Sequence, residues 1–230
     1  MTAIKKNIRH VRERIKAAAI RAGREPDSIK LVAVSKRKPV ELIRDAVNCG
    51  QLIFGENYLQ ESKEKISILG RNLTWHFIGH LQTNKAKAAA ELFQVIETVD
   101  RLKLANGLEK HLAALNRTMD VLVQVNVGRE LQKGGVLPEN AEKLIREISL
   151  CSHLKVKGLM AMPPFLVDSE AVRPFFREMR QIGNDLAAKG LLGRHGPLEL
   201  SMGMTADFEV AIEEGATLVR VGTALFGPRT

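Results

Sequence analysis

The chain has 230 residues, of which 45% are hydrophobic and 4% aromatic, and its 35 Lys and Arg outnumber 26 Asp and Glu to give a net charge of +9. This size and composition are typical of a globular protein of one or two domains and exclude a disordered chain. The basic residues are spread along the whole chain without interleaved aromatic side chains, so we expect no nucleic-acid partner, although the charge suits small phosphorylated ligands.

The two cysteines, Cys49 and Cys151, lie far apart in the sequence and have no metal-ligand residues beside them. We therefore expect neither a disulfide scaffold nor a metal site. Residues 1–10 lack the apolar segment of a signal peptide, and no apolar run reaches the length of a membrane span. The expected protein is cytoplasmic and contacts no membrane.

The hydrophobic pattern predicts an amphipathic helix near the amino end, followed by eight strands that alternate with helices. In the first helix, Ile4, Ile8, Val11, Ile15 and Ala19 recur at helical spacing with basic residues between them. The pattern predicts strands over residues 31–35, 52–54, 75–79, 95–99, 121–127, 156–162, 198–201 and 217–221. It predicts the intervening helices over residues 40–48, 59–69, 83–92, 101–116, 138–150, 172–189 and 208–214.

Strands that alternate with helices form parallel sheets through right-handed crossovers. Eight such units in a chain close to the roughly 250 residues typical of the fold predict an α/β protein with one closed (β/α)₈ TIM-type barrel and an extra N-terminal helix. An open doubly wound sheet is the alternative. Because the sequence has no linker or internal repeat, a single domain over residues 1–230 is expected.

Barrels of this kind often bind phosphate in the loops after strands seven and eight. Here these loops are residues 201–205 and 222–226, which are rich in small and hydroxyl-bearing side chains. Gly222 allows close approach of a ligand to the backbone, and Thr223 begins a short helix whose free N–H groups favour an anion. Ser201, Gly222 and Thr223 are thus the predicted phosphate residues, with two ordinary turns as the alternative.

Arg220 shares a strand face with Leu218 and Gly222, which points it into the mouth of the predicted barrel. A buried guanidinium needs a partner, because burial without one is costly. The sequence offers two compatible partners for Arg220. One is Glu199 on the neighbouring strand, and the other is an acceptor atom of a bound ligand.

Lys36 follows the first strand at the same end of the predicted barrel. Its neighbours Arg37 and Lys38 are consistent with an ordinary solvated lysine. In a barrel mouth, however, apolar walls and a nearby cation favour the neutral, nucleophilic amine, which forms Schiff bases with aldehydes. An aldehyde that also carries a phosphate and a ring nitrogen is pyridoxal 5'-phosphate (PLP). Lys36 for the aldehyde, Arg220 for the ring nitrogen and the phosphate loops form a consistent set.

Polar residues follow two further strands at this end. Asn57 comes after the second strand and is predicted to hydrogen-bond a substituent of the ring. His80 comes after the third strand and fits either the same role or a structural one.

The sequence resembles the pyridoxal phosphate homeostasis proteins, single-domain relatives of the alanine racemase N-terminal barrel. The matching segments lie at residues 31–36, 54–58, 75–79, 124–126, 158–160, 200–204 and 219–227. The resemblance implies that Lys36 carries PLP as an internal aldimine. It further implies that Ser201, Gly222 and Thr223 hold the phosphate and that Arg220 faces the pyridine nitrogen.

The resemblance also implies a function in intracellular PLP homeostasis. Apo PLP enzymes are the expected recipients of the cofactor, and a monomer or weak dimer is the expected oligomeric state. No residue is predicted to be catalytic. A PLP-dependent amino-acid racemase, or a related PLP enzyme of low activity, is the alternative. A racemase needs an acid and a base on opposite faces of its substrate, and the chain has one tyrosine, Tyr58. A nucleic-acid or partner-binding protein that exploits the charge is a third hypothesis.

Overall fold

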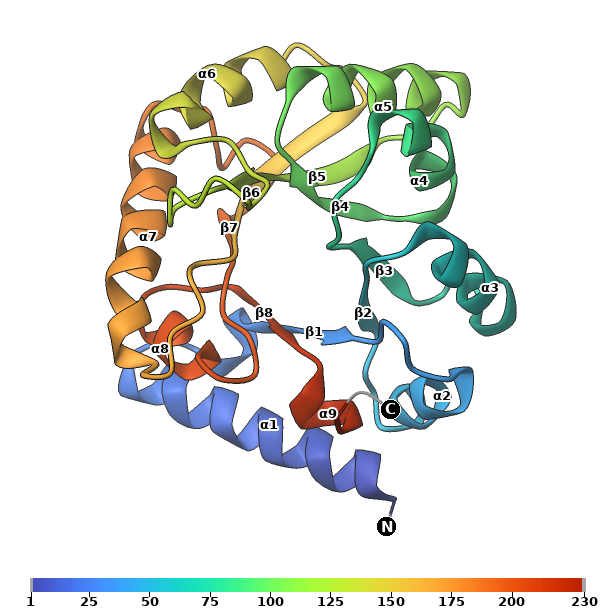
Figure 1. Cartoon of the computed structure of the whole chain (residues 1–230), viewed down its shortest axis with the longest axis vertical. Coiled ribbons are helices and arrows are strands. Elements are labelled where there is room, and N and C mark those ends of the chain that lie inside the picture. Colours follow the sequence, from blue (N-terminus) through green and yellow to red (C-terminus); the bar gives the residue numbers. More distant parts are fainter. Residues whose placement is uncertain (1, 229–230) are drawn as a thin grey trace.

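The computed structural model of the protein describes residues 2–228 and shows parallel strands closed into a barrel inside a ring of helices (Figure 1). Within these residues the strands are β1 (Lys30–Val34), β2 (Ile53–Glu56), β3 (Thr74–Phe77), β4 (Val95–Val99), β5 (Met119–Val125), β6 (Leu154–Ala161), β7 (Glu199–Ser201) and β8 (Leu218–Val221). They follow one another around the barrel in sequence order. The last strand pairs with the first, so that Lys30 lies opposite Leu218 and Val32 opposite Arg220. This closure confirms the predicted (β/α)₈ barrel and excludes the open sheet.

The helices lie where the hydrophobic pattern predicts them. They are α1 (Ala3–Arg21), α2 (Val40–Asn48), α3 (Leu59–Leu69), α4 (Ala86–Leu92), α5 (Leu102–Ala114), α6 (Pro138–Ile148), α7 (Arg173–Ala188), α8 (Phe208–Glu213) and α9 (Thr223–Phe226). Short 3₁₀ turns, η1 (Pro26–Ser28), η2 (Thr83–Lys85) and η3 (Glu170–Val172), precede β1, α4 and α7. The predicted bounds of α2, α3 and β4 match those of the structure.

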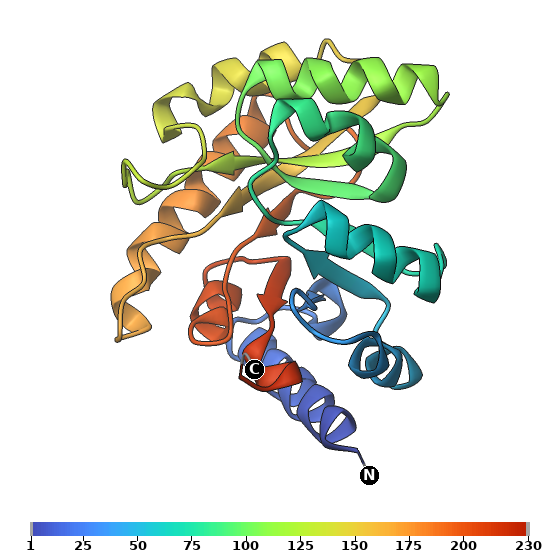
Figure 2. The same ribbon diagram turned by 45° about the vertical axis from the view of Figure 1, so that its right-hand side comes forward.

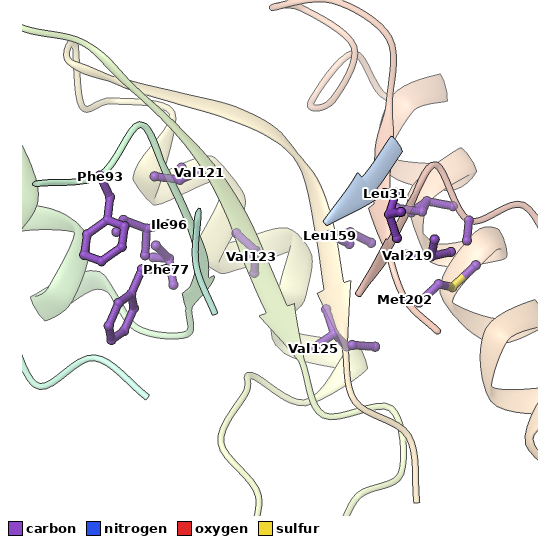
Figure 3. Close-up of a cluster of buried hydrophobic side chains, with 14 of the residues drawn as sticks. Leu31, Phe77, Phe93, Ile96, Val121, Val123, Val125, Leu159, Met202 and Val219 are labelled. Carbon is purple, nitrogen blue, oxygen red and sulfur yellow. The ribbon is translucent and has the colours of Figure 1, made fainter. Parts of the chain in front are cut away.

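The main hydrophobic core lies between the barrel wall and the helices. Along β5, Val121, Val123 and Val125 alternate with residues of the other face and join this core. Phe77 and Phe93 meet edge to face, with 5.2 Å between ring centroids. Figure 3 shows both rings near Val121 in one part of the cluster, while other members of the core lie at the opposite side of the view. Burial of each such side chain stabilises the fold by about 1.5–3 kcal/mol.

The inward face of the strands fills the barrel itself. Val32, Leu122, Met160 and Leu218 are fully buried and alternate with core residues that pack under the helices. Because the interior is packed with side chains, the space for a ligand lies at the end of the barrel where the strands finish.

Helix α1, at the amino end, packs against the carboxyl-terminal elements of the described chain. It packs against α8 and α9, and Figure 2 shows it running beside α9. Arg14 pairs with Glu209 of α8 at 2.8 Å, and the Asn7 amide donates to the carbonyl of Leu225 in α9 at 2.9 Å. The extra helix thereby holds the segment that follows β8 in place.

Over residues 2–228, every helix is too short or too polar to cross a bilayer.

Candidate functional site

Five of the six predicted site residues line one cavity of about 330 Å³ at the carboxyl ends of the strands. These residues are Lys36, Asn57, Arg220, Gly222 and Thr223. The remaining wall is formed by Val34, Ile78, Met162, Phe165, Leu166, Met204, Thr205, Ala206 and Asp207. The barrel topology therefore brings together residues that are separated by up to 187 positions in the sequence, from 36 to 223.

Lys36 lies in a tight turn that follows β1. The N–H of Lys38 donates to the carbonyl of Ser35 at 3.1 Å, which closes the turn around Lys36. Arg37 has a φ of 56°. A left-handed backbone costs a residue with a side chain about 1–2 kcal/mol, so contacts around this turn must hold it in shape.

Arg220 is buried at the base of the cavity. Its Nη1 donates to Ser201 Oγ at 2.6 Å, and its Nη2 donates to the carbonyl of Ala161 at 2.8 Å. Ser201 Oγ donates in turn to Glu97 Oε2 at 2.6 Å, and that carboxylate oxygen lies 3.8 Å from Arg220 Nη1. A guanidinium has five N–H donors, so further donors of Arg220 are available to an acceptor in the cavity.

Glu97 is the negative charge at the centre of this network. It lies in the middle of β4, is fully buried, and its Oε1 is 2.6 Å from His76 Nδ1 of β3. Burial alone would raise the pKa of Glu97, but the hydrogen bond to His76 and the charge of Arg220 outweigh it, so the pKa lies below the usual value. Burial lowers the pKa of Arg220, against the opposing effect of Glu97 and Asp207. The guanidinium remains charged because its ordinary pKa is so high.

Of the two partners predicted for Arg220, the ion pair with Glu199 was therefore wrong. Glu199 pairs instead with Lys30 at 2.6 Å, at the start of β1. The acidic partner of Arg220 is Glu97, which reaches it from β4 across the barrel. The spacing of the sequence does not connect these two residues. A signal for Glu97 was present, since it is the one charged residue of the predicted strand 95–99.

Ser201 does not line the cavity with the other predicted residues. It is fully buried, and its hydroxyl is already hydrogen-bonded to Glu97 and Arg220. It is thus one hydrogen bond removed from the cavity wall, through Arg220.

Asn57 carries an unsatisfied atom. Its Oδ1 is buried and has no hydrogen-bond partner among the described residues. Because an unpaired buried acceptor costs free energy, this atom indicates a missing donor at the cavity. Asn57 also lines a second, more polar space of about 380 Å³ that includes His80, Gln124 and Lys133.

The loops after β7 and β8 form the wall nearest Thr223. Gly203 has a φ of 90°, and a Cβ there would lie 2.6 Å from Ala211 Cβ, so the fold itself requires this glycine. At Gly222 the backbone is right-handed, and a Cβ would meet Val34 at an ordinary 3.4 Å. The protein therefore has room for a Cβ at Gly222, so a requirement for glycine at this position would come from a ligand in the cavity.

Other parts of the structure do not gather the predicted residues. A cavity of about 430 Å³ lies near the amino ends of β1 and β2 and is lined by residues such as Arg12, Ile29 and Leu52. Among the described residues, no group of three or more His, Cys, Asp or Glu has the arrangement of a metal site.

Comparison with known proteins gives full-length matches. The family model of the alanine racemase N-terminal domain matches residues 1–230. The pyridoxal phosphate homeostasis protein of Aquifex aeolicus is 46% identical over 220 residues, covering 95% of each chain. That of Escherichia coli K12 is 42% identical over 234 residues, covering 100% of this chain and 98% of the relative.

Solved structures agree with these matches. PipY of Synechococcus elongatus, solved with PLP bound, has a TM-score of 0.84 at 33% identity, covering 97% of this chain and 100% of its own. An alanine racemase of Clostridium difficile has a TM-score of 0.76 at 15% identity, over 97% of this chain and 57% of its own, which shows a shared fold alone.

Proposed function

The chain belongs to the alanine racemase N-terminal domain family, among relatives that are pyridoxal phosphate homeostasis proteins, and from this premise we propose that it binds PLP and serves PLP homeostasis. The observation that carries the proposal is the meeting of Lys36, Asn57, Arg220, Gly222 and Thr223 around one cavity. PLP supplies an aldehyde, a phosphate and an aromatic ring nitrogen when it is bound.

The residues of the cavity fit this group. The unpartnered Oδ1 of Asn57 would accept a hydrogen bond from a donor such as the ring hydroxyl of PLP. The remaining N–H donors of Arg220 suit the ring nitrogen, which is an acceptor when unprotonated. The backbone at Gly222 and the hydroxyl of Thr223 suit the phosphate oxygens. Ser201 orients Arg220 rather than contacting the phosphate.

Lys36 is the residue that bonds the cofactor in this proposal. Its amine condenses with the aldehyde of PLP and releases one molecule of water, without a change in oxidation state. The bond is reversible by the same addition of water, which suits a protein that stores the cofactor and returns it.

A racemase reaction is the less favoured alternative. It needs a second proton-transfer group opposite Lys36. The one tyrosine of the chain does not supply this group, because it contacts Arg37 outside the cavity. Tyr58 is 45% exposed, and its hydroxyl accepts a hydrogen bond from Arg37 Nη2 at 3.2 Å. It is absent from the residues that line the cavity with Lys36. The charged Arg220 at the ring nitrogen would also keep that nitrogen unprotonated, which makes the ring a poor electron sink.

Titration of the purified protein with PLP tests the proposal. A visible absorbance band of the bound cofactor should appear with one equivalent of PLP, and it should be absent in Lys36→Ala. Lys38→Ala is the matched control, because Lys38 lies two positions away and its Nζ donates instead to the carbonyl of Pro228 at 2.6 Å. A protein that stays colourless with excess PLP, or a Lys36→Ala variant with an unchanged band, would contradict it.

We further propose that the protein acts in the cytoplasm, as a monomer or weak dimer, and hands PLP to apo-enzymes. The test is to mix the loaded protein with an apo PLP enzyme while a trap removes free PLP. Transfer faster than the release of PLP into solution supports a direct hand-over, and transfer at the release rate argues against it.

A further inference from the structure

Lys65 is a buried lysine on α3, behind the wall of the cavity. Its side chain is 5% exposed. Its ammonium donates to Glu56 Oε1 at 2.7 Å, to Glu61 Oε1 at 2.6 Å and to the carbonyl of Ser35 at 2.6 Å. Since an ammonium has three N–H donors, each donor of Lys65 has one acceptor.

These bonds reach both peptide groups beside Lys36. The carbonyl of Ser35, bonded directly by Lys65, belongs to the peptide that precedes Lys36. The N–H of Arg37, which belongs to the peptide that follows, donates to Glu61 Oε1 at 2.5 Å. That same oxygen also accepts from Lys65. One cluster therefore holds the two peptide planes that set the direction of the Lys36 side chain.

The cluster also holds the unfavourable backbone of Arg37. Its left-handed φ of 56° is disfavoured for any residue with a side chain. The bond from its N–H to Glu61 and the packing of its guanidinium on the ring of Tyr58, 5.5 Å from the centroid, oppose relaxation of the turn. Strain of this kind persists only where its surroundings enforce it.

Stability alone does not account for these buried charges. Oε2 of Glu56 is buried without a hydrogen-bond partner among the described residues, and burial raises the pKa of Glu56 despite the nearby charge of Lys65. Apolar residues of similar volume often replace a buried ion pair without loss of stability. What apolar residues would not supply is the connection to Ser35 and Arg37.

We propose that Lys65, Glu56 and Glu61 form a positioning cluster that fixes the turn of Lys36, so that its amine enters the cavity in a direction suited to reaction with an aldehyde. The inference rests on the proposed function, because it assigns Lys36 the bond to PLP. The three residues act through the backbone of Lys36 and do not touch the cofactor.

The first test needs no PLP. Glu61→Ala removes the acceptor of the Arg37 N–H at a partly exposed position, so the fold should survive. Glu64→Ala is the matched control, since Glu64 is an exposed glutamate on the same helix. Hydrogen exchange at the Arg37 amide, followed by NMR, should be at least about tenfold faster in Glu61→Ala than in the control, which corresponds to about 1.4 kcal/mol. Equal exchange rates in the two variants would overturn the proposal.

The second test separates binding from bond formation. Mixing with PLP in a stopped-flow instrument gives the affinity of the first encounter and the rate constant of the step that follows it. In Glu61→Ala that rate constant should fall by about tenfold or more, as expected when reacting atoms lose their alignment. The affinity of the encounter should stay the same. Glu61→Gln keeps an oxygen acceptor and should recover most of the rate.

A loss confined to the affinity, or an unchanged rate constant in Glu61→Ala, would overturn the proposal. Lys65→Met is the stronger variant and should slow the step further. If it does not fold, the Glu61 variants decide alone. Absence of any covalent step in the unmodified protein would refute the proposed function, while the exchange measurement would still decide whether the cluster holds the turn.

Discussion

Substitution of Gly222 by alanine separates recognition of a phosphate from the stability of the fold. Gly222 has φ −116° and ψ −74°, so its φ is negative and does not demand glycine as a positive φ would. A Cβ there would meet Val34 Cβ and Val34 O at 3.4 Å, which is ordinary contact. Because neither the sign of φ nor the space around the Cβ demands glycine, we expect the free energy of unfolding to change by less than about 1 kcal/mol.

The effect on the ligand should be much larger. If the phosphate of PLP lies against the backbone of Gly222, an added methyl group forces it away and loses at least one hydrogen bond to a charged group. Such a bond is worth about 1.5–3 kcal/mol. With a tenfold change for each 1.4 kcal/mol, the affinity for PLP should fall by about 10- to 100-fold.

Pyridoxal, which lacks the phosphate, is the control ligand. Equilibrium titrations with PLP and with pyridoxal should show the Gly222→Ala loss for PLP alone, and urea unfolding should show a change in stability below about 1 kcal/mol. Equal losses for both ligands, or an unchanged affinity for PLP, would refute the assignment of the phosphate to this loop.

Other predictions concern the buried network. Glu97→Gln should destabilise the protein by about 3 kcal/mol in urea unfolding at neutral pH, because it leaves the charge of Arg220 without its buried counter-charge; a loss below about 1 kcal/mol would contradict this. The folded pKa of Glu97 is lowered, so its stabilisation is present above the unfolded value of about 4.3 and is lost as the pH falls below it. The stability difference between the two proteins should therefore narrow toward pH ~3, and a constant difference would refute the sign. Ser201→Ala should cost about 1 kcal/mol of stability and weaken PLP binding less than Gly222→Ala does. A phosphate-specific loss as large as that of Gly222→Ala would show that Ser201 contacts the phosphate after all.

The sequence predicted those features that depend on local pattern and on counting. Pro39 before α2 and Gly50 after it mark the ends of that helix, and the structure agrees with both. Eight alternating units left the barrel as the favoured topology, and the barrel then brought positions 36, 57 and 220 to one end. Residues at strand ends were therefore found without knowledge of any contact.

The sequence did not predict contacts that cross the barrel or pass behind it. Glu97 reaches Arg220 from β4, whereas Glu199 of the neighbouring strand, the protein partner that the strand pattern suggested, pairs with Lys30. Lys65 lies in a charged helix and resembles a solvated residue in the sequence, yet it is buried against Ser35. The closure of the barrel and the packing of the helices place both side chains. The spacing of residues in the sequence does not show these tertiary contacts.

The bond between Lys36 and PLP is tested most directly by mapping the site of covalent attachment. The protein is mixed with PLP, the bond is fixed by reduction with borohydride, and the peptides are mapped by mass spectrometry. We expect one pyridoxyl group per chain, located on Lys36. A label spread over surface lysines, or concentrated on another residue such as Lys38 or Lys133, would contradict it.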